Sequence, residues 1–345
     1  MARPLDQLPK AHLHLHFTGS MRLETLVDMA DHHGIRLPRS LVGAWPPQLT
    51  STESRGWFRF QRLYDAARAC VRSEADMRRI VREAVLDDAA EGSRWLELQV
   101  DPTSYAPFVG GLTPALEIVL DEVEAASAES GIGAGVIVAA SRIRHPLDAR
   151  TLARLAAHHA GPVVGFGLSN DEHRGRTEDF APAFKIAERA GLGRMPHGGE
   201  LLGADAVTRT LDSLHPTRIG HGVRAAEDPR VLDRLARDGV ALEVCPASNV
   251  ALGVYPDPAD VPARRLLDHG VTVALGADDP LLFGSRLVEQ YRIAREEWGL
   301  DDEALAELAR SSLRASTAPP PSATAPSPTS TRGCVCPSRR STRSW

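Results

Sequence analysis

The chain has 345 residues, 43% of them hydrophobic and 25% charged, with a net charge of −5 and a pI near 6.2. These values are typical of a folded globular protein and exclude a wholly disordered chain. The mild acidity does not favour nucleic acid or a membrane surface as a partner. No apolar run approaches the roughly 20 residues that span a bilayer, and the N-terminal segment lacks the apolar core of a signal peptide. Four cysteines are too few for a disulfide scaffold, so we expect a cytoplasmic protein.

Short apolar runs bounded by turn residues predict eight buried β-strands. The runs begin at Ala11, Trp95, Ile132, Pro162, Arg194, Thr217, Ala241 and Val271. Amphipathic stretches between them predict helices, for example over 115–130 and from Arg230 to a stop signal at Gly239. Strands that alternate with helices favour a parallel sheet, and eight such units favour a (β/α)₈ TIM barrel over 8–314. An open doubly wound sheet is the alternative.

The segment between the first two predicted strands is long, and we expect a helical lid insertion at about 22–92. Helical patterns cover Leu23–His33, Trp57–Val71 and Met77–Ala90. Extra helices on a loop that follows a barrel strand would cover the end of the barrel where active sites of this fold lie. We therefore expect one barrel domain with a lid rather than two domains.

The composition changes after about Arg314, where the helical periodicity ends. No Asp or Glu follows Glu307, and Pro, Ser, Thr and Arg dominate the remaining residues. A segment of this composition cannot bury a core, so we expect 315–345 to be a disordered tail. Two origins stay open at this point: a native basic tail, or a reading-frame shift that replaced a final helix.

Histidine and carboxylate side chains stand where the predicted strands end. Residues i and i+2 of a strand face the same side, so His14 and His16 share one face of the first strand. His197, His221 and Asp278 stand at the ends of the fifth, sixth and eighth strands. Because the carboxyl ends of barrel strands open at one mouth, we expect these side chains to meet there. Three His and one Asp suit Zn²⁺ or a similar divalent ion, and a further His beside them suits metal-assisted hydrolysis.

Six stretches of the chain together resemble the adenosine deaminase family of zinc-dependent barrel hydrolases. In chain order they are LPKAHLHLHFTGSMRLETL, GLSNDE, PHGGE, RIGHG, CPASN and GADDPLLFG. The resemblance covers about Leu8 to Leu313, nearly the whole predicted barrel. It implies one Zn²⁺ per chain with four protein ligands, which are His14, His16, His197 and Asp278.

The resemblance also implies a role for each residue around the metal, and Asp278 counts among the catalytic residues as well as the ligands. Glu200 matches the acid that protonates ring N1 of an aminopurine, and His221 matches the residue that orients and helps deprotonate the attacking water. Asp279 matches the residue that faces N7, and Asn170 stands where a backbone amide meets N3. The implied reaction is hydrolytic deamination at C6. Because C6 is a poor electrophile until N1 is protonated, we expect the pKa of Glu200 to be raised.

The first motif departs from the family at a position that bears on the substrate. Adenosine deaminases usually have Asp there and adenine deaminases tend to have Glu, whereas this chain has Thr18, followed shortly by Arg22. The change removes a negative charge and adds a positive one near the 5′ side of a bound nucleoside. The HFTGSMR stretch resembles the actinobacterial aminodeoxyfutalosine deaminases of the futalosine route to menaquinone. We therefore expect Thr18 and Arg22 to bind 6-amino-6-deoxyfutalosine, with Arg22 binding its carboxylate through two hydrogen bonds.

Other functions stay open at the level of sequence. Adenosine, deoxyadenosine and methylthioadenosine are alternative substrates for the same site. A non-catalytic purine-binding protein is a second class, which the unusual tail suggests. A nucleic-acid deaminase is disfavoured, because those enzymes pair H-x-E with P-C-x-x-C and the stretch that begins at Cys245 reads CPAS. We expect a small-molecule aminopurine nucleoside as the partner, with no nucleic acid and no membrane.

Overall fold

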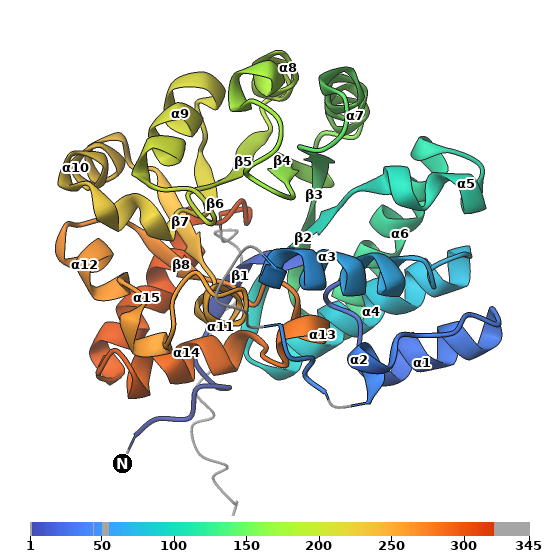
Figure 1. Cartoon of the computed structure of the whole chain (residues 1–345), viewed down its shortest axis with the longest axis horizontal. Coiled ribbons are helices and arrows are strands. Elements are labelled where there is room, and N and C mark those ends of the chain that lie inside the picture. Colours follow the sequence, from blue (N-terminus) through green and yellow to red (C-terminus); the bar gives the residue numbers. More distant parts are fainter. Residues whose placement is uncertain (1, 44, 50–54, 321–345) are drawn as a thin grey trace, which may run out of the picture.

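The structure, a computed structural model, describes residues 2–43, 45–49 and 55–320. Its centre is a sheet of eight strands that pair in parallel in the order β1 to β8 (Figure 1). The strands are β1 (Lys10–His16), β2 (Ser93–Val100), β3 (Gly133–Ser141), β4 (Val163–Ser169), β5 (Gly193–Gly198), β6 (Arg218–His221), β7 (Ala241–Val244) and β8 (Val273–Leu275). A doubly wound sheet reverses its strand order, so this consecutive order excludes that alternative.

The barrel closes where the segment after β8 meets β1. The backbone N–H of His16 donates to the carbonyl of Asp278 at 3.0 Å, and the N–H of Asp278 donates to the carbonyl of His14 at 3.0 Å. The predicted (β/α)₈ TIM barrel is thereby confirmed. The same two hydrogen bonds fix three of the predicted metal ligands against one another, because all three belong to the closing segments.

Continuous apolar strands fit a sheet that is covered on both faces. Val136, Ile137 and Val138 are consecutive in β3, so their side chains point alternately into the barrel and towards the outer helices, and all three are fully buried. Parallel strands of this kind read as uninterrupted apolar runs for that reason. The pattern explains why the strands were predictable from short windows of sequence.

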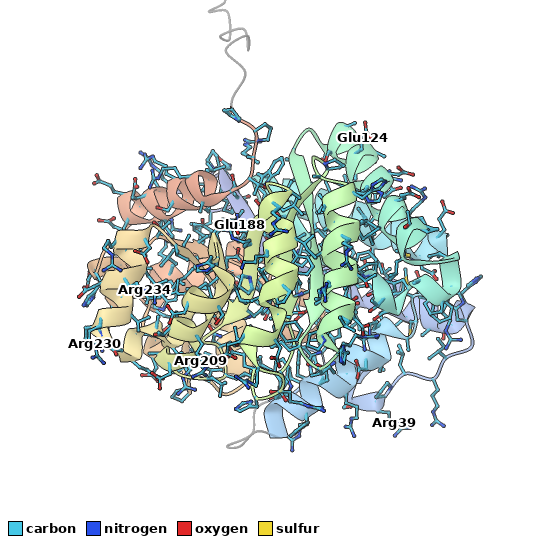
Figure 2. The ribbon with its side chains drawn as sticks, turned by 90° about the horizontal axis from the view of Figure 1, so that it is seen from above. Arg39, Glu124, Glu188, Arg209, Arg230 and Arg234 are labelled. Atoms are coloured by element: carbon cyan, nitrogen blue, oxygen red, sulfur yellow. The ribbon has the colours of Figure 1, made fainter. Side chains whose placement is uncertain are left out.

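Fifteen helices are present in the described part of the chain. They are α1 (Leu23–His32), α2 (Arg39–Val42), α3 (Arg55–Arg68), α4 (Glu74–Ala90), α5 (Ala106–Val109), α6 (Leu112–Ser130), α7 (Pro146–His158), α8 (Ala181–Arg189), α9 (Ala204–Leu214), α10 (Pro229–Asp238), α11 (Pro246–Ala251), α12 (Ala263–Asp268), α13 (Pro280–Phe283), α14 (Leu287–Glu296) and α15 (Asp302–Ala315). Charged side chains such as Arg209, Arg230 and Arg234 project from the outer helices (Figure 2). None of the described helices is both long and apolar enough to cross a membrane.

Helix α10 shows how the sequence sets the bounds of an outer helix. Asp228 caps its start by accepting the N–H of Arg230 at 2.9 Å, and Gly239 ends it with a φ of 68°. Left-handed backbone of this kind is unfavourable for residues with a Cβ atom, which makes glycine a common stop signal. The predicted helix and its stop are confirmed.

Two predicted strands were too long, because turns near the site interrupt them. The run that begins at Ala241 predicts a strand as far as Ser248, but β7 ends at Val244 and Pro246 begins α11. Proline suits the first turn of a helix because its missing N–H is not needed there. The strand predicted over 271–279 is reduced to β8, and Asp278 has a φ of 62°, which is incompatible with an extended strand.

The long segment between β1 and β2 holds helices α1 to α4, of which α1 lies farthest from the barrel strands in Figure 1. Helix α4 packs on β2 and α6, so it occupies the place of an ordinary outer barrel helix. Helix α3 instead contacts α13 and contributes side chains to the cavity at the mouth of the barrel. Of the expected insertion at 22–92, α3 is thus the part that lies at the mouth.

The C-terminal end of the described chain is hydrogen-bonded to the barrel. After α15, the backbone N–H and the hydroxyl of Thr317 donate to Oε1 of Glu97, at 2.7 and 2.8 Å. Residues 321–345, which make up most of the tail predicted at 315–345, lie outside the described residues. The disorder expected there, and its origin, stay predictions.

Candidate metal and catalytic site

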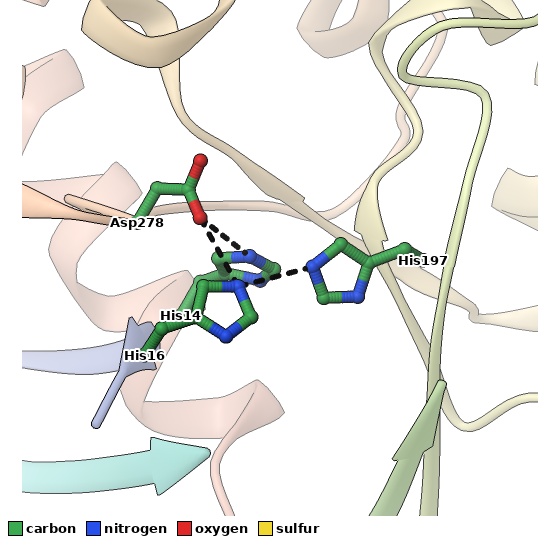
Figure 3. Close-up of side chains that lie close together, drawn as sticks. All are labelled: His14, His16, His197 and Asp278. Atoms are coloured by element: carbon green, nitrogen blue, oxygen red, sulfur yellow. Dashed lines mark hydrogen bonds and ion pairs between the residues drawn. The ribbon is translucent and has the colours of Figure 1, made fainter. Parts of the chain in front are cut away.

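Four predicted ligands converge at the mouth of the barrel, from β1, β5 and the segment after β8 (Figure 3). Ring nitrogens of His14, His16 and His197 and a carboxylate oxygen of Asp278 all lie within 4.8 Å of one another. Nε2 of His16 lies 3.1 Å from Oδ1 of Asp278 and 3.2 Å from Nε2 of His197. The structure thus places these four side chains together at the mouth of the barrel.

The state of His14 shows that the cluster fits a divalent cation. Its Nδ1 lies 2.7 Å from Oε2 of Glu243, so the ring donates there and presents Nε2 to the cluster. That Nε2 is buried and has no hydrogen-bond partner among the described residues. Burial lowers the pKa of His14, but the neighbouring carboxylates of Asp278 and Glu243 outweigh burial and raise this pKa to about 9. The surrounding field therefore favours positive charge at the position a metal would take.

Asp278 is held in place from several sides. The hydroxyl of Ser248 donates to its Oδ2 at 2.6 Å. Burial would raise the pKa of Asp278, but the neighbouring rings of His14 and His16 hold it well below its usual value, so the carboxylate stays charged. The ring of His12 accepts the backbone N–H of Ala277, the residue before Asp278, at 3.0 Å. This hydrogen bond fixes the segment that leads to Asp278. This contact gives His12 a structural role in the site.

Glu200 lies beside the cluster on a loop that a second carboxylate organises. Both oxygens of Glu172 accept backbone N–H groups of four consecutive residues, with distances of 2.6 to 3.0 Å to residues 199–202. The pKa of Glu200 is raised well above its usual value, first by burial and then by the charges of Asp278 and Glu172. The pKa of Glu200 is thus shifted in the direction that the sequence led us to expect, which favours the protonated acid.

His221 stands between the two acids. Its Nε2 lies 3.7 Å from Oε2 of Glu200 and 3.9 Å from Oδ2 of Asp278. Burial lowers the pKa of His221 to about 3, so the ring is neutral at pH 7 and can accept a proton. His221 ends β6 and lines the cavity, and its φ is 60°. Backbone strain of this kind in residues with a Cβ atom is concentrated at functional sites.

Asp279 and Asn170 complete the wall around the predicted purine site. Burial and the neighbouring charge of Asp278 raise the pKa of Asp279 well above its usual value, which favours a protonated carboxyl that can donate a hydrogen bond. A Cβ atom on Gly19 would lie 1.8 Å from Oδ1 of Asp279, so glycine is required there. Asn170 lines the same cavity with a φ of 81°.

One cavity joins these residues to the lid. Seven of the predicted site residues line it: His16, Asn170, His197, Glu200, His221, Asp278 and Asp279. Helix α3 adds Trp57, Phe60, Gln61, Tyr64 and Arg68. Tyr105, which follows β2, lies on the same wall. The cavity is therefore polar at the barrel and aromatic at the lid.

The structure does not bring Thr18 or Arg22 to this cavity. Thr18 is fully buried, and its hydroxyl lies 2.6 Å from the hydroxyl of Tyr105, so it reaches the cavity wall through that ring. Arg22 binds Asp87 of α4 with both Nε and Nη2, at 3.1 and 2.5 Å, and faces a different hollow. Arg22, the residue before α1, points away from the cavity. Its closeness to the metal motif in the sequence does not indicate this direction.

Three residues that hold the site in place by hydrogen bonds were not predicted from the sequence: Glu172, Ser248 and Glu243. All three lie in or beside the stretches that carry the family resemblance, so a signal was present. Their partners are backbone N–H groups or other side chains of the site, and such partners are defined by the folded loops rather than by residue type.

Comparisons with known proteins agree with the fold and the site. The family model described as adenosine deaminase matches residues 9–325. A Streptomyces virginiae protein provisionally named adenosine/adenine deaminase is 63% identical over 319 residues, which cover 92% of this chain and 94% of that protein. An adenine deaminase of Sinorhizobium medicae is 38% identical over 314 residues, 89% of this chain and 94% of that protein.

Among solved structures, the adenine deaminase of Arthrobacter aurescens superposes with a TM-score of 0.83 at 31% identity, over 90% of this chain and 94% of that one. An amidohydrolase of Burkholderia ambifaria with bound zinc gives a TM-score of 0.80 at 25% identity, over 90% of this chain and 86% of that one.

Proposed function

Since the chain belongs to the adenosine deaminase family and is thus a deaminase that hydrolyses C–N bonds, we propose that it deaminates C6 of an aminopurine nucleoside with the help of one Zn²⁺. The observation that carries this proposal is the buried acid Glu200, next to His221, beside a four-residue cluster that suits a cation. His14, His16, His197 and Asp278 would hold the ion. Zn²⁺ bound there supplies a Lewis acid that activates water at neutral pH.

Glu200 supplies a proton to N1 of the purine in this proposal. A protonated N1 withdraws electrons from C6, which then accepts the oxygen of water and becomes tetrahedral. The bond from C6 to the exocyclic nitrogen breaks as that nitrogen takes the proton that His221 accepted from the water, and ammonia leaves. The remaining hydroxyl proton passes to the carboxylate of Glu200, which leaves a carbonyl at C6 and restores the acid. The buried setting that raises the pKa of Glu200 keeps the proton available for this step.

The neutral ring of His221 and the protonated carboxyl of Asp279 have complementary tasks. His221 accepts the proton of the attacking water, because its lone pair is free at neutral pH. Asp279 donates a hydrogen bond to N7, which is an acceptor in aminopurines. Together with N1 bound by Glu200, this contact orients the ring so that C6 faces the four-ligand cluster.

For the substrate, we propose 6-amino-6-deoxyfutalosine, converted to futalosine and ammonia on a route to menaquinone. Thr18 occupies the position at which adenosine deaminases carry an acid for the 5′-hydroxyl. The hydroxyl of Thr18 is hydrogen-bonded to the hydroxyl of Tyr105. Nothing at that position thus favours a free 5′-hydroxyl. The aromatic lid side of the cavity supports a substrate with an apolar arm in its place.

Adenosine, deoxyadenosine or adenine is the second candidate substrate. The names of the relatives favour it, because they are adenosine/adenine or adenine deaminases. The metal cluster and Glu200 serve either substrate equally, so the cavity beyond the purine decides between them.

The test is a comparison of kcat/KM for 6-amino-6-deoxyfutalosine, adenosine and adenine on zinc-replete protein, with ammonia release as the readout. We expect 6-amino-6-deoxyfutalosine to exceed adenosine and adenine by about tenfold or more, which corresponds to about 1.4 kcal/mol of transition-state binding. A higher kcat/KM for adenosine or adenine would contradict the proposed substrate and identify that compound as the substrate instead. Zinc-loaded protein that releases ammonia from none of the three would reject a purine deaminase altogether.

A further inference from the structure

Helix α3 presents one face to the cavity, and that face ends in an arginine. Trp57, Phe60, Tyr64 and Arg68 follow one another at intervals of three or four residues, which places them along one side of the helix. The rings of Trp57 and Phe60 lie 5.2 Å apart, and those of Phe60 and Tyr64 lie 5.8 Å apart. The guanidinium of Arg68 lies over the ring of Tyr64 at 5.8 Å. An aromatic wall thus leads to a cation.

The chemistry of purines determines what would reach this wall. C6 lies at the opposite end of the bicyclic ring from N9, which carries the sugar. When C6 faces the metal ligands, N9 and everything attached to it point away from the barrel strands. The substituent on the 5′ carbon of the sugar is the outermost part of the ligand. It therefore extends towards the cavity wall that α3 provides.

Arg68 is available to an anion on this side of the cavity. Among the described residues that line the cavity, it is the one arginine or lysine. Its Nη2 donates to Oδ1 of Asp65 at 2.5 Å, but both side chains are partly exposed, at 31% and 47%, so this pair is weak. The guanidinium has five N–H donors and can keep Asp65 while it binds a second carboxylate.

Asp101, an acid on the same wall, already accepts hydrogen bonds from a neighbouring residue. Asp101 lines the cavity, and its Oδ1 accepts both the N–H and the hydroxyl of Thr103, at 3.0 and 2.5 Å. Its carboxylate caps the turn that follows β2 and is not paired with Arg68 by a hydrogen bond. Arg22, the arginine that the sequence favoured for this task, is bound to Asp87 and faces another hollow.

We propose that Arg68, with Tyr64 and Trp57, forms a specificity subsite for an anionic aromatic arm on the 5′ side of an aminopurine nucleoside. The inference rests on the proposed function, because it places C6 at the metal ligands. An aryl ring stacks on the aromatic wall, and the guanidinium binds the carboxylate of the arm through two parallel hydrogen bonds. Arg68 acts on binding and not on the chemical step, so its effect falls on KM.

The experiment measures kcat and KM of Arg68→Met for three substrates: 6-amino-6-deoxyfutalosine, the methyl ester of its carboxylate, and adenosine. Hydrogen bonds to charged groups contribute enough to predict a fall in kcat/KM of about 10- to 100-fold for the acid, mainly through KM. The ester and adenosine should change by less than about threefold. Arg62→Met is the matched control, because Arg62 is an exposed arginine of the same helix outside the cavity wall, and it should leave all three values unchanged.

The outcomes separate this subsite from the function on which it rests. Equal losses for acid, ester and adenosine, or no loss for the acid, would overturn the subsite while the wild type still deaminates adenosine. A selective loss for the acid in Arg22→Met and not in Arg68→Met would move the carboxylate to the other arginine and also overturn the proposal. Failure of the wild type on all three substrates would reject the proposed function itself.

Discussion

Two neighbouring carboxyl groups of the site have pKa values shifted in opposite directions because their surroundings differ. The rings of His14 and His16 lower the pKa of Asp278, whereas burial and the charges of Asp278 and Glu172 raise the pKa of Glu200 and favour its protonated form. A pair of acids with pKa values driven apart is a recurrent way to obtain a ligand or base and an acid at the same pH. The ionised residue suits the metal, and the protonated one suits the substrate.

The variant Glu200→Gln tests the proton donor directly. Glutamine keeps the shape and can donate a hydrogen bond to N1, but it cannot transfer a proton. We expect kcat to fall by about 10²- to 10⁴-fold with one zinc ion retained per chain. In the wild type the active form is the protonated acid, so activity should decline as pH rises through the raised pKa of Glu200. A variant within about tenfold of the wild type would rule out proton donation by this residue.

At the residue scale, the sequence revealed the groups that carry the reaction but not those that support them. His14 and His16 were recognisable because a strand period of two places them on one face. Glu172 was not, because its partners are four backbone N–H groups of a loop that exists only in the folded chain. Arg22 was misplaced because closeness in sequence does not determine which way a side chain turns.

At the scale of elements, a buried charge network connects three strands to the first metal ligand. Arg218 of β6 donates to Oε1 of Glu243 in β7 at 2.6 Å and also pairs with Glu97 of β2. Glu243 in turn accepts from His14 of β1. All four side chains are buried, so each charge depends on its partners. The barrel interior thereby fixes the orientation of a ligand at its mouth.

The variant Glu243→Gln should weaken zinc binding, because an amide holds the Nδ1–H of His14 less firmly than a carboxylate does. Changes at such supporting residues typically cost 10- to 100-fold in metal affinity, and we expect an increase of about that size in the Kd for zinc, measured by competition with a chelator. Glu188→Gln, an exposed substitution on α8, is the matched control (Figure 2). Unchanged affinity in Glu243→Gln would show that His14 does not need this partner.

Strand positions were predictable because buried parallel strands are short apolar runs. Their ends were not, since the turns that follow β7 and β8 continue with apolar or small residues such as Cys245 and Gly276. The helices of the lid segment were predictable, but which of them packs on the barrel and which lines the cavity was not. That α4 belongs to the barrel wall and α3 to the cavity follows from packing, which amphipathic periodicity does not specify.

At the scale of the whole molecule, Lys10 joins the N-terminal segment to the barrel at the end opposite the cavity. Its buried ammonium donates to the carbonyls of Leu5 and Leu8, at 3.0 and 3.1 Å, and to that of Glu91. Burial lowers the pKa of Lys10 to about 8, against attraction from Glu91 and Asp88. The charged form is therefore disfavoured in the folded state relative to the unfolded one.

Stability should depend on pH through Lys10 in a defined window. Between about pH 8 and the unfolded pKa of about 10.4, the unfolded chain binds a proton at Lys10 that the folded chain does not. The contribution of Lys10 to the free energy of unfolding thus increases as pH rises through this window, and it is lost as pH falls through about 8. Urea unfolding of the wild type and Lys10→Met at several pH values measures it. A difference between the two proteins that is constant from about pH 7 to 10.5 would contradict this account.

The barrel itself was predictable because eight apolar runs alternate with helical patterns over one continuous length of chain. Its closure was not, since the hydrogen bonds between His16 and Asp278 join residues that are distant in sequence. The closure is also what completes the metal site, because it brings the eighth strand's aspartate to the first strand's histidines. Fold and site are thus determined by the same contact.

Zinc titration of metal-free protein tests the central claim most directly, with ammonia release from 6-amino-6-deoxyfutalosine and from adenosine as the readout. The account predicts that activity rises in proportion to added zinc and becomes constant at one ion per chain, with no such rise in a His14→Ala variant. Activity that does not depend on zinc, or the absence of ammonia at full zinc occupancy, would contradict it.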